Sequence, residues 1–181
     1  MIENLRTWIE IDQKALLGNA RSFLRLLPQK TIFMAVVKSN AYGHGLVETA
    51  RVLSSINPTH NKLMCGIKNG KVWFGVDSIT EAMSLRKSGV KNKILVLGQT
   101  LPTRLAEAQK NKIIITVSNF SILTAVKKIS SPPLFFLKID SGMHRQGFME
   151  SDLSRLITDL KTFGQKPVGV YTHFASPTDP Q

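Results

Sequence analysis

Short, almost uninterrupted apolar runs recur along this chain, and stretches with helical periodicity separate most of them. The runs are TIFMAVV (31–37), VWFGV (72–76), KILVLG (93–98), KIIITV (112–117), LFFLKI (134–139) and PVGVYTHF (167–174). Near-continuous apolar strands are typical of a parallel sheet that helices cover, whereas half-exposed strands alternate between apolar and polar residues. The sequence therefore predicts an α/β protein built on a parallel sheet.

Apolar residues at three- and four-residue spacing predict amphipathic helices between these runs. Asp12 is expected to cap the first helix, which ends at Pro28, and Ser78 with Glu81 predicts a capping box at the start of another. The remaining helices are predicted at 46–53, over 101–110, from about 119, and over 153–163.

Two segments lie outside this alternation. TWIEID (7–12) is predicted to be a leading strand in front of the first helix. The polar segment 57–72 contains Pro58, Gly66 and Gly70, and we expect a loop or a small hairpin there. Neither its sequence nor its length indicates a function.

The succession of strands and helices favours a (β/α)8 TIM-barrel type with parallel strands. About six βα units are present, whereas a complete barrel has eight strands in about 250 residues. No G-x-G-x-x-G or Walker motif follows any run, which disfavours the Rossmann and P-loop folds. The sequence predicts an incomplete barrel that is part of a longer protein.

Composition excludes several classes of protein. The 181 residues are 43% hydrophobic and carry a net charge of +12. The basic residues are scattered, so a solvated basic surface is favoured over a nucleic-acid interface. The single cysteine, Cys65, excludes an internal disulfide, fits a reducing compartment and is interpreted as a small buried hydrophobe. With no apparent signal peptide or membrane span, the cytoplasm is expected. The histidines lack metal-ligand spacing, so no metal site is expected.

Polar residues follow three of the apolar runs, at the strand ends where a βα-barrel carries its active site. Lys38 and Tyr42 follow the first run, and His173 and Ser176 follow the sixth. The fifth run leads into Lys138, Asp140, His144 and Arg145.

Each of these residues has a structural alternative: a solvated lysine, an ion-pair network or a structural histidine. Together, however, they bring an amine, a guanidinium and an imidazole to one barrel mouth. Burial of Lys38 at the end of an apolar strand would disfavour its ammonium form and free the amine to bond a carbonyl. Pyridoxal 5′-phosphate (PLP), an anionic aldehyde, is the cofactor that suits such a lysine.

Three motifs resemble the signatures of alanine racemases, in the order and at roughly the spacing of that family. AVVKSNAYGHG (35–45) is similar to the PLP-lysine motif, LKIDSGMHRQGF (137–148) to the second signature, and GVYTHFASPTD (169–179) to the third. Weaker matches, FGVDSITEA (74–82) and ILVLGQTLP (94–102), extend the resemblance over nearly the whole chain.

The resemblance implies roles for individual residues. Lys38 would carry PLP covalently and act as acid or base on one face of the substrate's Cα. Tyr42 would reach the PLP phosphate, His173 would lie against or beside the pyridine ring, and Ser176 is a further cofactor-binding candidate.

Two more roles come from the second signature. Arg145 would lie near the ring and substrate and help to position a catalytic tyrosine of the partner subunit. Lys138 matches a position that is carbamylated in some members, where the carbamate would orient Arg145. Without it, a lysine so close to Arg145 would require some other compensating anion.

For the whole protein, the resemblance implies a homodimeric alanine racemase that supplies D-alanine for cell-wall peptidoglycan. Residues 1–11 would be a strand that packs with a C-terminal β-domain, and 12–181 the barrel. We expect this chain alone to be inactive, since that domain supplies the tyrosine. A racemase of another small amino acid such as serine, a non-catalytic PLP-binding barrel and a basic nucleic-acid-binding domain remain as alternatives.

Overall fold

The computed structural model describes residues 6–28, 31–56 and 72–176. In them, six strands form one sheet in chain order, and every neighbouring pair is parallel. The strands are β1 (Met34–Val36), β2 (Trp73–Val76), β3 (Ile94–Gln99), β4 (Ile114–Val117), β5 (Phe135–Lys138) and β6 (Gly169–Tyr171). Each apolar run contains one strand, so the predicted parallel sheet is confirmed.

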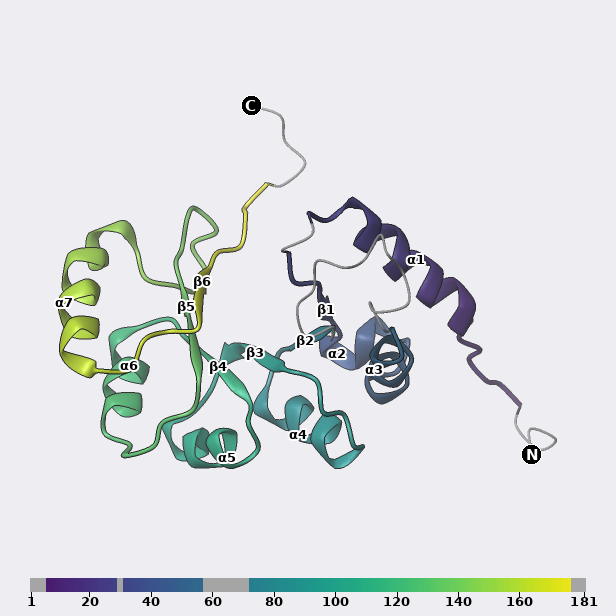
Figure 1. Cartoon of the computed structure of the whole chain (residues 1–181), viewed down its shortest axis with the longest axis horizontal. Coiled ribbons are helices and arrows are strands. Elements are labelled where there is room, and N and C mark those ends of the chain that lie inside the picture. Colours follow the sequence, from purple (N-terminus) through teal and green to yellow (C-terminus); the bar gives the residue numbers. More distant parts are fainter. Residues whose placement is uncertain (1–5, 29–30, 57–71, 177–181) are drawn as a thin grey trace.

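The sheet is curled, and helices lie along its outer side, which gives a half-barrel of the TIM type (Figure 1). The helices are α1 (Gln13–Leu26), α2 (Lys38–Tyr42), α3 (Leu46–Ser54), α4 (Ile79–Lys87), α5 (Leu105–Lys110), α6 (Phe120–Lys127) and α7 (Leu153–Phe163). Short 3₁₀ turns, η3 (Pro102–Arg104) and η4 (Glu150–Asp152), precede α5 and α7. The predicted fold class is confirmed.

Side-chain caps start the helices where the sequence predicts them. Asp12 accepts hydrogen bonds from the backbone N–H groups of Lys14 and Ala15 at the start of α1. Ser78 and Glu81 form the expected capping box of α4. These bonds satisfy N–H groups that have no partner within the helix, and so define each helix start.

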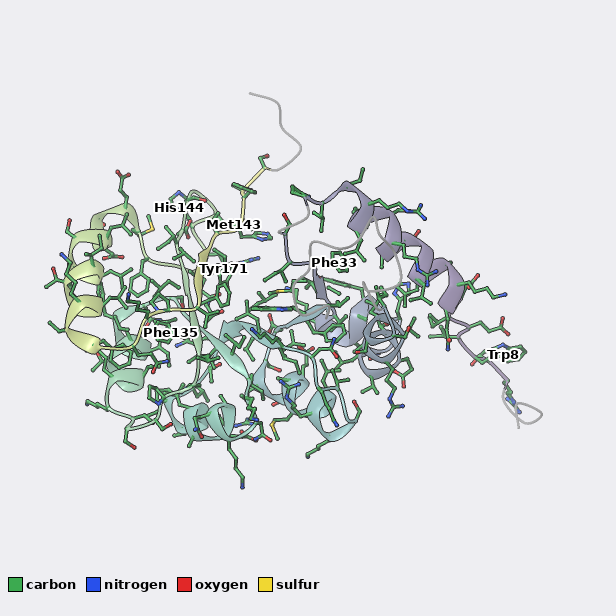
Figure 2. The ribbon with its side chains drawn as sticks, in the orientation of Figure 1. Trp8, Phe33, Phe135, Met143, His144 and Tyr171 are labelled. Atoms are coloured by element: carbon green, nitrogen blue, oxygen red, sulfur yellow. The ribbon has the colours of Figure 1, made fainter. Side chains whose placement is uncertain are left out.

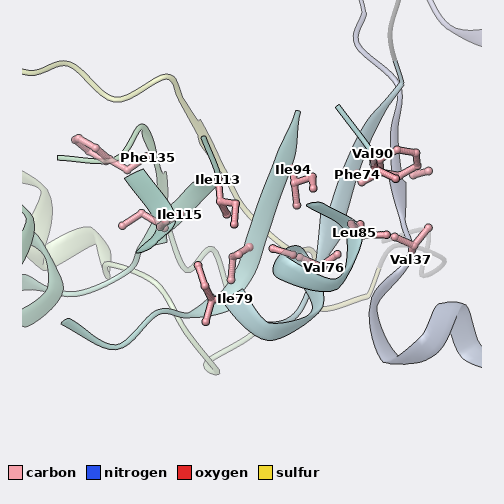
Figure 3. Packing of buried hydrophobic residues seen from close by; sticks show 14 of the residues in the cluster. Val37, Phe74, Val76, Ile79, Leu85, Val90, Ile94, Ile113, Ile115 and Phe135 are labelled. Atoms are coloured by element: carbon pink, nitrogen blue, oxygen red, sulfur yellow. The ribbon is translucent and has the colours of Figure 1, made fainter. Parts of the chain in front are cut away.

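Both faces of the strands are packed, which explains the uninterrupted apolar runs. Outward side chains form the main core against the helices (Figure 3), and the fully buried ones include Phe74, Ile94, Ile115 and Phe135. On the inner face a smaller cluster is centred on Trp73, Leu95 and Ile114. Packed side chains on both faces consequently support the carboxyl ends of the strands.

Residues 7–12 contain no strand in the described part of the chain, and the predicted packing of this segment with a C-terminal β-domain stays a prediction. Trp8 and Ile9 are exposed, and Figure 2 shows Trp8 away from the sheet. An alternating pattern alone does not make a strand, because the ladder needs a partner, and no described residue pairs with this segment. The expected loop or hairpin at 57–72 lies, but for Val72, outside the described residues.

Candidate active site

A cleft of about 590 Å³ opens at the carboxyl ends of the strands. Segments that follow β1, β2, β5 and β6 line it, together with residues of β3. Five of the sequence-predicted site residues lie on its wall: Lys38, Tyr42, Lys138, Arg145 and His173. Ser176 is exposed beyond β6 and does not line the cleft, so the structure does not bring it to the other candidates.

Lys38 lies two residues after the end of β1 and faces Asp77, which directly follows β2. The Lys38 Nζ lies 4.0 Å from Asp77 Oδ1, and the two side chains are 30% and 61% exposed. The burial predicted for Lys38 is therefore only partial, because the cleft leaves its amine open to solvent beside a carboxylate. A reactive amine at this point is accessible to a small molecule.

The segment after Lys38 is a left-handed turn. Ser39, Asn40, Ala41 and Tyr42 all have φ between 50° and 54°. L-residues with a Cβ adopt this conformation at a steric cost, so tertiary contacts must hold it. The turn brings the exposed side chain of Tyr42 to the same cleft as Lys38.

Lys138, the last residue of β5, is 6% exposed and points into the floor of the cleft. Its Nζ lies 3.4 Å from Gln146 Oε1 and 5.7 Å from the ring centre of Tyr171. Burial lowers the pKa of the Lys138 ammonium, and the positive charges of Arg145 and Lys38 lower it further against the opposing charge of Asp140. Lys138 is thus a buried amine whose charged form is disfavoured by its surroundings.

Asp140 folds the loop that carries Arg145. Its carboxylate accepts hydrogen bonds from the backbone N–H groups of Gly142, His144 and Arg145, at 3.0, 2.9 and 3.0 Å. The bonds from Gly142 and His144 contribute most to lowering the pKa of Asp140. At the loop's end, a Cβ on Gly147 would lie 2.5 Å from the Asp140 nitrogen, so only glycine fits.

The inner side chain of β6, Tyr171, forms the back of the cleft (Figure 2). Its hydroxyl lies 2.9 Å from Thr116 Oγ1 and 3.3 Å from the Leu97 carbonyl oxygen. Burial raises the pKa of the Tyr171 phenol, which therefore stays protonated. Two residues further on, His173 is exposed at the rim of the cleft.

Sequence reasoning missed Asp77, Gln146 and Tyr171 as residues of the cleft. Asp77 could have been found, because it directly follows an apolar run just as Lys38 does. No sequence pattern marks Gln146. Its amide hydrogen-bonds Lys138 and Ser118, and Ser118 comes from the end of β4, so this contact exists only in the folded chain. Tyr171 was read only as part of an apolar run, since its inward direction depends on the register of β6.

The described part of the chain contains neither a cluster of metal-ligand side chains nor a membrane-spanning helix. Among those residues, no group of His, Cys, Asp and Glu is arranged to hold a metal ion. In the same part of the chain, no helix combines the length and apolar character needed to cross a membrane.

A curled parallel sheet with polar residues gathered at its carboxyl ends defines a βα-barrel domain of the TIM class. Residues 11–181 match a family described as alanine racemase, N-terminal domain. The chain belongs to the alanine racemase family.

Curated relatives agree with this match. The chain is 36% identical over 175 residues to an alanine racemase of Geobacillus stearothermophilus, covering 94% of this chain and 42% of the relative. It is 37% identical over 173 residues to one of Listeria monocytogenes, covering 94% and 43%. The chain therefore spans less than half the length of these relatives.

Solved structures show the same likeness. Alanine racemase from Bacillus anthracis with bound L-Ala-P superposes with a TM-score of 0.77 at 31% identity, covering 94% of this chain and 42% of that chain. The Clostridium difficile enzyme in complex with cycloserine superposes with a TM-score of 0.77 at 30% identity, covering 95% and 45%.

Proposed function

We propose that the chain forms the PLP-binding half-barrel of an alanine racemase, which interconverts L-alanine and D-alanine. The relatives' names supply the reaction. The observation that carries the proposal is the cleft itself: Lys38, Lys138 and His173 come from the ends of three different strands and line one space. Arg145 reaches the same space from the loop after β5.

The side chains of the cleft fit PLP by their chemistry. Lys38 offers an accessible primary amine for the cofactor's carbonyl, while the Tyr42 hydroxyl and the Arg145 guanidinium suit its anionic phosphate and the substrate carboxylate. The His173 imidazole at the rim suits contact with a flat ring. When bound, PLP supplies the electron sink that makes the substrate's Cα proton acidic.

Lys38 Nζ is the atom of this chain that would move the Cα proton on one face of the substrate. Asp77, 4.0 Å away, would stabilise the Lys38 amine once it has taken up that proton. The family resemblance assigns the opposite face to a tyrosine of a second subunit, and we therefore propose a homodimer for the whole protein.

Lys138 is our candidate for carbamylation. Its lowered pKa enlarges the fraction of neutral amine, the form that reacts with CO2, and a carbamate would place an anion beside Arg145. Intact-mass measurement with and without bicarbonate tests this, with Lys138→Met as control. An added CO2 that persists in the control would contradict the assignment.

D-alanine from this reaction would serve peptidoglycan synthesis, and we assign the protein to the cytoplasm. The single cysteine of the sequence supports a reducing compartment.

Covalent capture of PLP is the first test of this function. The 181-residue chain is incubated with PLP, reduced with borohydride and mapped by peptide mass spectrometry. We expect the adduct on Lys38, and its loss in Lys38→Arg. Lys93→Arg is the matched control, since Lys93 lies over the Trp73 ring at the opposite ends of the strands. Adducts spread over surface lysines in equal yield would refute the site.

Substrate choice is tested separately on the whole protein. Conversion of L-alanine to D-alanine is measured by chiral chromatography, with L-serine as competitor substrate and Lys38→Ala as the inactive control. Faster conversion of serine than of alanine would contradict alanine as the substrate. It would not contradict the proposed PLP site.

A further inference from the structure

One carboxylate joins the segments that follow β1 and β2. Glu81, in the first turn of α4, accepts a hydrogen bond from the Ser39 backbone N–H at 2.7 Å through Oε1. Its Oε2 accepts from the Asp77 backbone N–H, also at 2.7 Å. Ser39 is the neighbour of Lys38, and Asp77 is the carboxylate that faces it.

The Ser39 N–H bond is made at the start of a strained stretch of backbone. Ser39 begins the left-handed turn that ends at Tyr42. The other bonds of this turn stay within its own βα unit: Ala41 N–H donates to the Val37 carbonyl, and Asn40 Oδ1 accepts from Leu46 N–H. Among the described residues, Glu81 thus accepts the hydrogen bond that ties the turn to the next unit.

The ionised form of Glu81 suits this task. A carboxylate forms stronger hydrogen bonds to N–H groups than a neutral acceptor does, and the amino end of α4 favours negative charge. The capping box with Ser78 fixes the side chain from its other side.

We propose that Glu81 is a positioning residue for Lys38: by holding Ser39 and Asp77 with one carboxylate, it keeps the left-handed turn that presents Lys38 and Tyr42 to the cleft. This rests on the proposed function, because positioning matters only if Lys38 takes up a cofactor. Glu81 also belongs to the capping box of α4, where its Oε2 accepts from the Ser78 backbone N–H at 3.4 Å, but its bonds to Ser39 and Asp77 reach beyond that box.

Two variants separate positioning from capping. Glu81→Gln keeps the shape but replaces one acceptor oxygen by an NH2 group, so one of the two N–H groups loses its partner. Ser78→Ala removes the other half of the capping box and leaves both bonds of Glu81 to Ser39 and Asp77 possible. Circular dichroism verifies folding, and Glu81→Asp replaces Glu81→Gln if that variant does not fold.

The first readout is hydrogen exchange of the Ser39 and Asp77 backbone amides, measured by NMR. We expect exchange of at least one of them to become about tenfold faster in Glu81→Gln, and to be unchanged in Ser78→Ala. Unchanged exchange at both amides in Glu81→Gln would overturn the proposal. This readout does not depend on PLP.

The second readout is the rate of PLP capture at Lys38. We expect it to fall about tenfold in Glu81→Gln and to recover partly when Ser39→Gly is added, since glycine adopts the left-handed turn without steric cost. An equal fall in Ser78→Ala, or no recovery with glycine, would overturn positioning. If the unsubstituted chain captures no PLP at Lys38, the proposed function fails, and exchange still decides whether Glu81 holds the turn.

Discussion

At the scale of single residues, Asp140 shows how one carboxylate organises a functional loop. It accepts hydrogen bonds from three backbone N–H groups of the segment that ends in Arg145. An ionised acceptor satisfies them better than a neutral one, and this preference lowers its pKa. The position of Arg145 therefore depends on a charge that does not itself line the cleft.

Asp140→Asn should lower the free energy of unfolding at neutral pH. In the variant, this free energy should also fall less as the pH is lowered. Because the pKa of Asp140 is lowered in the fold, its contribution is present above the ordinary aspartate pKa of about 3.9 and disappears as pH falls through the lower folded value. Denaturant unfolding from pH 7 to about pH 3 measures this. The exposed Glu150→Gln is the control; a difference from the unsubstituted chain that does not shrink in acid would contradict the role.

At the scale of elements, Arg86 joins two connections at the amino-terminal ends of the strands by hydrogen bonds. From α4 its guanidinium donates to the carbonyl oxygens of Val90 and Asn92 at 2.8 Å each, and to those of Asn111 and Lys112 at 2.9 and 3.0 Å. These carbonyls belong to the connections that lead into β3 and β4. Burial lowers the Arg86 pKa, yet an arginine stays charged.

Arg86→Met should destabilise the fold without altering the cleft. Four carbonyl groups lose a charged donor, and three of them belong to buried or half-buried residues, so we expect a loss of about 2–4 kcal/mol in unfolding free energy. Denaturant titration measures the loss, and PLP capture at Lys38 is followed under folding conditions. Reduced capture by the folded variant would show that this end of the sheet also controls the site.

At the scale of the whole molecule, the half-barrel has two open edges. Among the described residues, β1 and β6 each have a strand neighbour on one side only. Val170 on β6 is 59% exposed, and Phe174 just beyond it is 69% exposed. Unpaired backbone beside apolar side chains favours association of chains, which the net charge of +12 opposes.

Self-association of the isolated chain should therefore rise with salt. Ions screen the repulsion, since the Debye length falls from about 10 Å at 0.1 M to about 3 Å at 1 M salt. Val170→Lys should reduce association several-fold, whereas Ser121→Lys, which adds the same charge on an exposed face of α6, should reduce it less. Light scattering distinguishes the two; equal effects would indicate net charge alone.

Local sequence patterns predicted most of the elements. The six apolar runs and the caps at Asp12 and Ser78 correspond to what the structure contains, because burial on both faces and unpaired N–H groups are local demands. TWIEID forms no strand among the described residues, because a strand also requires a partner, which no local pattern reports; its pairing with a C-terminal β-domain stays a prediction.

By itself, the sequence determined the parallel sheet, its helices and the candidates at the strand ends, since each depends on residues close together in the chain. Only the tertiary structure decided which of them share a cleft: Lys38 and Lys138 do, whereas Ser176 does not. It also placed Asp77 beside Lys38 and Glu81 on Ser39, because contacts between different βα units follow from sheet register and curvature, which no local spacing encodes.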